Sequence, residues 1–145
     1  MKVTQISVFL ENKKGRLFEV CDLLGRHEIN IRALNIAETA DYGVLRMVVD
    51  DPADALNVLK ENNIIANRTE VVAVEVSDRP GGLAAILRIL NNSEVNVEYM
   101  YGFFEKGPDQ AVLVFRFDDT DQAIALLKKH HVRIVTSADI EGRLG

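Results

Sequence analysis

The sequence predicts two small α+β domains in tandem, each an antiparallel sheet with two helices on one face, in the chain order βαββαβ. Two observations support this fold class. An internal repeat covers nearly the whole chain, and strand-like and helix-like hydrophobic periodicities follow one another in the same order in both copies. A copy of about 70 residues buries only a small core, so we expect each copy to be stabilised by packing against a neighbouring domain.

The repeat stays in register over most of the chain. Asn12–Leu17 aligns with Asp78–Leu83, which places Gly15 on Gly81. After a two-residue insertion, the match resumes between Leu45–Asp50 and Leu113–Asp118. We therefore divide the chain into residues 1–69 and 70–145.

Each copy contains the same predicted elements. Alternating apolar residues predict first strands at 3–10 and 71–76, and an apolar stripe at helical spacing predicts helices at 16–27 and 82–92. The first of these stripes contains Leu17, Val20, Cys21 and Leu24, and the second contains Leu83, Ile86, Leu87 and Leu90. Two strands joined by a turn follow, then a second helix that starts near Asp51 or Thr120. Last strands are predicted at 64–69 and 132–140.

Composition and motifs exclude several function classes. A net charge of −5 without clustered Lys and Arg argues against a nucleic-acid partner. No apolar run approaches the roughly 20 residues that span a bilayer, so we expect no membrane association and a cytoplasmic location. The single Cys21 is expected to be a buried structural thiol, and the histidines lack metal-ligand spacing. We expect no metal, no cofactor and no catalysis.

Acidic pairs precede the second helix of each copy. Asp50-Asp51 and Asp118-Asp119 resemble a catalytic carboxylate pair, but acidic side chains at this position help a helix to start. We interpret both pairs as helix caps.

The loop between the first strand and first helix carries the strongest functional signal. A glycine at a helix start exposes backbone N–H groups, which together with the helix dipole attract a carboxylate. Asn12 and Asp78 can either cap the turn or accept a hydrogen bond from an ammonium group. A free α-amino acid offers both charged groups. A plain turn and helix cap is the more common use of such a motif.

A family resemblance adds to this interpretation. Asp78-Arg79-Pro80-Gly81 before a helix, followed by Glu94-Val95-Asn96-Val97, resembles the ACT domain family, and the first copy repeats the pattern more loosely. The resemblance implies a ferredoxin-like fold and a regulatory module that binds amino acids where two domains meet side by side. It nominates as ligand-binding residues Asn12, Gly15, Arg16, Leu17 and Asn30, and Asp78, Pro80, Gly81, Gly82, Leu83 and Asn96. Lys14 departs from the proline that the pattern prefers.

The leading hypothesis is a regulatory protein that senses a free amino acid and acts in trans on a metabolic enzyme. Aliphatic residues such as Val44 and Val112 on the sheet face away from the helices predict a homodimer or larger homo-oligomer. Two alternatives remain: a ligand-independent oligomerisation module, and an RNA-binding sheet. The central strands lack the pattern of exposed aromatic and basic residues that an RNA-binding sheet needs. We expect the aromatic hairpin either to pack in the core or to line a pocket for a large ligand side chain. Its aromatic residues are Tyr99, Tyr101, Phe103 and Phe104.

Overall fold

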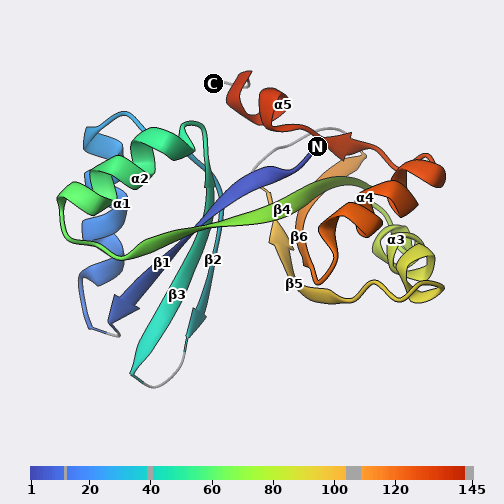
Figure 1. The fold of residues 1–145 in the computed structure, drawn as a ribbon, viewed down its shortest axis with the longest axis horizontal. Helices are drawn as coiled ribbons and strands as arrows, with labels where there is room; N and C mark the ends of the chain where they lie inside the picture. The colour runs from blue at the N-terminus through green and yellow to red at the C-terminus, as the bar shows by residue number, and fades with distance from the viewer. Residues whose placement is uncertain (12, 39–40, 104–108, 143–145) are drawn as a thin grey trace. The chain divides into compact units, whose positions relative to one another are not determined.

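The computed structural model describes residues 1–11, 13–38, 41–103 and 109–142. The first copy contains β1 (Val3–Glu11), α1 (Arg16–Arg26), β2 (Ile31–Glu38), β3 (Tyr42–Val49) and α2 (Pro52–Glu61). The second contains α3 (Gly82–Asn91), β5 (Val97–Gly102), β6 (Gln110–Phe117), α4 (Thr120–Lys129), β7 (Ile134–Val135) and α5 (Ser137–Gly142). β4 (Ala66–Ser77) is one continuous strand that joins them, where the sequence predicted two (Figure 1).

The chain folds into two compact units. The N-terminal unit contains Thr4–Thr69, and the C-terminal unit is formed by Met1–Val3 together with Glu70–Ile140. In the N-terminal unit the strands follow the order β2-β3-β1-β4, and in the C-terminal unit β6 lies between β4 and β5 while β7 pairs with β4. β3 runs antiparallel to β1 and β2, and β4 and β5 run antiparallel to β6, so the predicted α+β fold of two βαββαβ units is confirmed.

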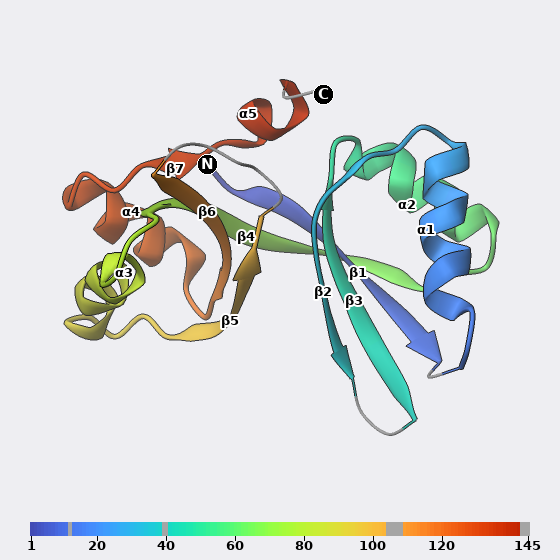
Figure 2. The ribbon, with the colours of Figure 1, turned by 180° about the vertical axis from the view of Figure 1, so that it is seen from behind.

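In each unit, two helices cover one face of the sheet. α1 and α2 lie over the strands of the N-terminal unit, and α3 and α4 lie over those of the C-terminal unit (Figures 1 and 2). The alternation of the strands decides which side chains meet the helices. The core of the N-terminal unit includes, from the strands, Ile6, Val8, Leu45 and Met47, and, from α1, Val20 and Leu24. The core of the C-terminal unit includes, from the strands, Val72, Val74, Phe115 and Phe117, and, from α3, Ile86 and Leu90. The rings of Phe115 and Phe117 are stacked, with their centroids 5.4 Å apart.

The predicted helix stripes are buried at their centres and exposed at their edges. Leu17 and Leu83, in the first turn of each helix, keep 39% and 36% of their surface exposed, and Leu87 keeps 37%. All three belong to the predicted apolar stripes. Because they flank the line that faces the sheet, they remain on the surface beside the loops.

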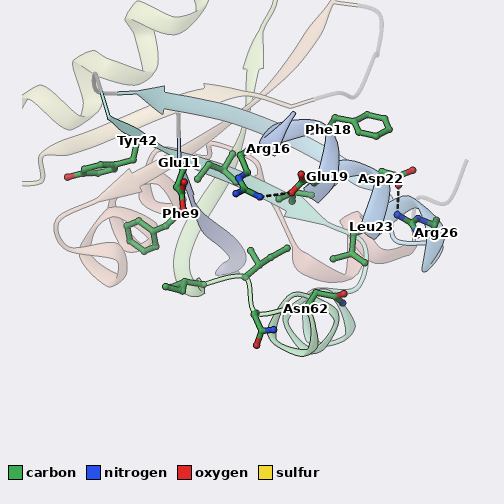
Figure 3. A pocket seen from close by; sticks show the side chains of 15 residues that line it. Phe9, Glu11, Arg16, Phe18, Glu19, Asp22, Leu23, Arg26, Tyr42 and Asn62 are labelled. Carbon is green, nitrogen blue, oxygen red and sulfur yellow. Dashed lines mark hydrogen bonds and ion pairs between the residues drawn. The ribbon is translucent and has the colours of Figure 1, made fainter. Parts of the chain in front are cut away.

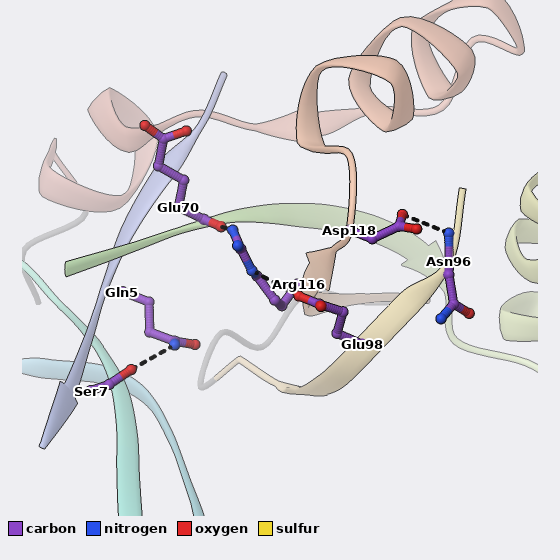
Figure 4. Close-up of polar contacts among 7 residues, drawn as sticks. All are labelled: Gln5, Ser7, Glu70, Asn96, Glu98, Arg116 and Asp118. Carbon is purple, nitrogen blue, oxygen red and sulfur yellow. Dashed lines mark hydrogen bonds and ion pairs between the residues drawn. The ribbon is translucent and has the colours of Figure 1, made fainter. Parts of the chain in front are cut away.

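Arg116 joins three strands of the C-terminal unit on the face away from the helices. Its Nε donates to Glu98 on β5 at 3.1 Å, and its Nη1 donates to the backbone carbonyl of Glu70 on β4 at 2.8 Å (Figure 4). Tyr101 and Phe103 of the aromatic hairpin are buried, but neither belongs to the core under α3 and α4. Tyr101 pairs with Val114, on the sheet face away from the helices. Phe104 lies outside the described residues.

The predicted last strand at 132–140 is wrong after Val135, because residues from Ser137 onward form α5. Thr136 and Asp139 form a reciprocal capping pair. The Asp139 carboxylate accepts from the backbone N–H of Thr136 at 3.0 Å and from its hydroxyl at 2.9 Å, while the Asp139 N–H donates to Thr136 Oγ1 at 3.2 Å. These bonds hold the pKa of Asp139 below its ordinary value. None of the helices in the described ranges is long and apolar enough to cross a bilayer.

We expect Thr136→Ala to lower the free energy of unfolding by about 1 kcal/mol, because the side-chain acceptor of the Asp139 N–H is removed. Thr136→Ser keeps the hydroxyl and is the matched control. Urea unfolding monitored by circular dichroism measures both. Equal stability of the two variants would contradict the capping assignment.

Candidate ligand site

Both copies pass from strand to helix through the same tight turn. In the first copy the N–H of Lys13 donates to the carbonyl of Glu11 at 2.8 Å, and in the second the N–H of Arg79 donates to that of Ser77 at 3.0 Å. The first turn of each helix follows directly. The repeat therefore extends from the sequence to the backbone geometry of the loop.

A glycine in a left-handed conformation ends each turn and serves as the N-cap residue. Gly15 has φ 91° and Gly81 has φ 85°, a region that costs other L-residues roughly 1–2 kcal/mol. Because glycine has no side chain, it cannot accept from the first-turn amides. No other side chain caps either helix within the described residues. The N–H groups at these two helix starts remain free of side-chain acceptors there.

The predicted capping role of the loop acid is not observed in the second copy. Asp78 is exposed, and its backbone N–H donates to the carbonyl of Asp109 at 2.9 Å. Its carboxylate is therefore available beside the start of α3. The equivalent Asn12 lies outside the described residues.

The two loops differ at the first helical residue. A Cβ placed on Gly82 would lie 1.9 Å from the carbonyl oxygen of Ser77, so the chain packs against this glycine too closely for a side chain. The equivalent residue of the first copy is Arg16, whose guanidinium pairs with Glu19 at 3.0 Å. Pro80 and Leu83 are exposed around the tighter loop, as Leu17 is beside the first.

The two nominated asparagines are held by backbone hydrogen bonds, and their side chains are exposed. The N–H of Asn30 donates to Asp50 Oδ1 at 3.0 Å, and that of Asn96 donates to Asp118 Oδ1 at 2.8 Å (Figure 4). Asp50 and Asp118 thus fix the entry into the second strand, and their assignment as helix caps was wrong. The caps are the next residues, Asp51 and Asp119.

Within one unit, the structure places the loop and the asparagine at opposite ends of the sheet. Glu11 pairs with Tyr42 at one end of β3, whereas Ile31, next to Asn30, pairs with Val49 at the other. At about 3.3 Å per residue, those two ends of β3 are roughly 23 Å apart. The C-terminal unit repeats this spacing, because Ser77 pairs with Gln110 and Val97 with Phe117. One amino acid cannot touch both parts of one unit.

A groove of about 890 Å³ lies beside the loop in the N-terminal unit. Figure 3 shows the Arg16–Glu19 pair on one side of it, and Phe9 and Leu23 at either end. The segment before β4 also lines it, with Asn62, Asn63, Ile64 and Ile65. Sequence reasoning did not find this groove. The available signal was an outward-facing Phe9 in a strand and an isoleucine directly after a turn.

The remaining titratable groups do not form a reactive centre. Burial raises the pKa of the Cys21 thiol, which keeps it protonated at neutral pH. Lys13, 2.9 Å from Glu11, lowers the pKa of that carboxyl at the groove's edge. His27 bonds through Nδ1 to the carbonyl of Leu23 at 2.9 Å, and no three metal-binding side chains cluster among the described residues.

Comparisons with known proteins agree with the fold. The family model described as "ACT domain pair" matches residues 1–142. The crystal structure of protein BT0572 from Bacteroides thetaiotaomicron is 40% identical, with a TM-score of 0.92 over 99% of this chain and 98% of that one. The ligand-free regulatory subunit of aspartate kinase from Thermus thermophilus is 15% identical, with a TM-score of 0.65 over 88% of this chain and 90% of that one, and shows the fold alone. A search of curated proteins finds no match.

The two βαββαβ units with glycine-started helices, together with the family match, define a tandem pair of regulatory-type domains. The chain belongs to the ACT domain pair family, as the resemblance of its two loops predicted.

We expect Gly82→Ala to lower the free energy of unfolding by about 1–3 kcal/mol, because the new methyl group meets the Ser77 carbonyl. Gly25→Ala is the matched control. Gly25 lies in α1 with open space where a methyl group would lie, so the same change there is neutral or stabilises the helix by up to about 1 kcal/mol. Thermal unfolding compares the two, and an unaffected Gly82→Ala variant would contradict the close approach.

Proposed function

We propose that the chain is a regulatory protein that senses a free amino acid, with one ligand-binding ACT domain in residues 1–69 and another in 70–145. The observation that supports this most is the pair of helix starts at Gly15 and Gly81, which lack a side-chain cap within the described residues. Such N–H groups and the positive end of the helix dipole favour an α-carboxylate.

The loop side chains supply the partner for the ammonium group. Asp78 is exposed and next to the start of α3, where its carboxylate accepts from an ammonium. Asn12 takes this role in the first loop with an uncharged acceptor. Gly15, Arg16 and Leu17, and Pro80, Gly81, Gly82 and Leu83, shape the space around the ligand. An aspartate binds an ammonium more strongly than an asparagine does, so the two loops differ in affinity.

The asparagines complete the site from a different ACT domain. Since Asn30 and Asn96 lie roughly 23 Å from the loop of their own unit, a ligand that touches both a loop and an asparagine needs two domains. We propose that a homodimer or larger homo-oligomer brings them together. Ligand binding then stabilises one arrangement of the assembly, and linkage couples that arrangement to the affinity for a partner. We propose a cytoplasmic metabolic enzyme as that partner.

The function is tested by titrating the full chain with each of the twenty amino acids in a calorimeter and by thermal shift. We expect at least one amino acid to bind and to raise the melting temperature, because a ligand that binds the folded state stabilises it. An absence of heat and of any shift for all twenty would favour the ligand-independent oligomerisation module.

We expect Asp78→Ala to weaken that binding about tenfold, because the ammonium group loses a charged acceptor. Glu61→Ala removes an exposed carboxylate at the end of α2, outside the two strand–helix loops in the sequence, and is expected to leave the affinity unchanged. The same calorimetric titration measures both variants. Equal affinities would show that Asp78 does not contact the ligand.

A further inference from the structure

We propose that the groove of the N-terminal unit selects an amino acid with a large apolar side chain. The groove consists of Phe9, Leu23, Ile64 and Ile65 with the Arg16–Glu19 pair. This inference rests on the proposed function and names the ligand class, which neither the fold nor the family assignment specifies.

Charged, polar and apolar side chains all line the groove. Arg16 and Glu19 are among the charged residues, and Glu11 lies at the end next to Arg16 (Figure 3). Ile64 and Ile65 also line the groove, and the N–H of Phe9 donates to the carbonyl of Ile65. Phe18 lines the outer rim, but Figure 3 shows its ring directed away from the groove, so we leave it out of the site. A lining with both charged and apolar side chains suits a molecule that carries charges and hydrocarbon.

The second copy provides an internal comparison for the apolar residues. The N–H of Phe9 donates to the carbonyl of Ile65 at 3.1 Å, and the N–H of Glu75 donates to the carbonyl of Arg133 at 3.0 Å. These two pairs therefore occupy the same backbone positions. In the C-terminal unit the side chains form an ion pair, with Arg133 Nε 3.1 Å from Glu75. The fold accepts polar residues here, so the exposed Phe9 (46%) and Ile65 (69%) are not required for folding.

The charged residues of α1 also differ from their counterparts in the second copy. Arg16 and Glu19 correspond in the repeat to Gly82 and Ala85, which carry no charge. Tyr42 pairs with Glu11 across the sheet, and its counterpart Gln110 pairs with Ser77. At these positions the N-terminal unit has its ion pair on α1 and apolar side chains at Phe9 and Ile65, whereas the C-terminal unit has its ion pair at Glu75 and Arg133. Two copies with one backbone design have diverged in the chemistry of this surface.

The charges and the size of the groove indicate its occupant. Arg16 and Glu19 place one charge of each sign in the first turn of α1, next to the helix start that we propose holds the carboxylate. A volume of about 890 Å³ falls within the range of small-molecule sites, roughly 300–1,000 Å³. A small side chain such as that of alanine would leave Phe9 and the isoleucines in water. A leucine- or phenylalanine-sized side chain covers them, so apolar burial favours the larger ligand.

The test is a calorimetric titration of the full chain with the twenty amino acids, repeated on two double variants. F9E/I65R places the ion pair of the C-terminal unit in the groove, at backbone positions that accept it in the other copy. E75F/R133I makes the reverse exchange in the C-terminal unit and is the matched control. Circular dichroism and thermal unfolding confirm that both variants fold.

We expect leucine, methionine or phenylalanine to bind at least about tenfold more tightly than alanine or glycine. F9E/I65R should remove that preference, and E75F/R133I should keep it. Binding of only small or charged amino acids by the unchanged chain would overturn this inference and leave the proposed function standing. An unchanged preference in folded F9E/I65R would also overturn it. Failure of all twenty to bind would contradict the proposed function itself.

Discussion

A left-handed glycine at the start of the first helix of each unit is the constraint on which the candidate site depends. Gly15 and Gly81 turn the chain from the sheet into the helix within a few residues. A residue with a Cβ would strain this turn, and a residue with a polar side chain could cap the amides that the glycine leaves open. The first helical N–H, that of Arg16 or Gly82, donates to the loop carbonyl of Lys13 or Arg79. The same choice of residue therefore gives the tight turn and leaves the following N–H groups without a side-chain cap among the described residues. A fold requirement and a binding property arise from one position.

Duplication separates what the architecture needs from what a ligand needs. Features that recur in both units are structural: the glycine turn, the aspartate that caps the second helix, and the aspartate that holds the start of the second strand. Features that differ are free to serve recognition. Phe9 against Glu75 and Ile65 against Arg133 are the clearest of these differences, because the backbone hydrogen bonds around them are the same. Each unit acts as a reference for the other.

The element order, the helix caps at Asp51 and Asp119, and the glycine loops could be predicted from the sequence, because they depend on periodicity and local chemistry. α5 was missed although Thr136 and Asp139 carry a capping signal, since a short apolar run beside it favoured a strand. The separation of Asn30 from the loop follows from strand register, which the hydrophobic pattern alone does not give. The groove depends on side chains from α1, β1 and the segment before β4, so no single stretch of sequence reveals it.

The central claim is that amides at the glycine-started helices hold the carboxylate of an amino acid. An NMR titration of the ¹⁵N-labelled full chain with the amino acid that binds best in calorimetry tests this most directly. The account predicts that the largest amide shifts fall on Gly15–Phe18 or on Gly81–Leu83, at the first turns of α1 and α3. Shifts confined to other parts of the chain, with both of these segments unchanged at saturation, would contradict it.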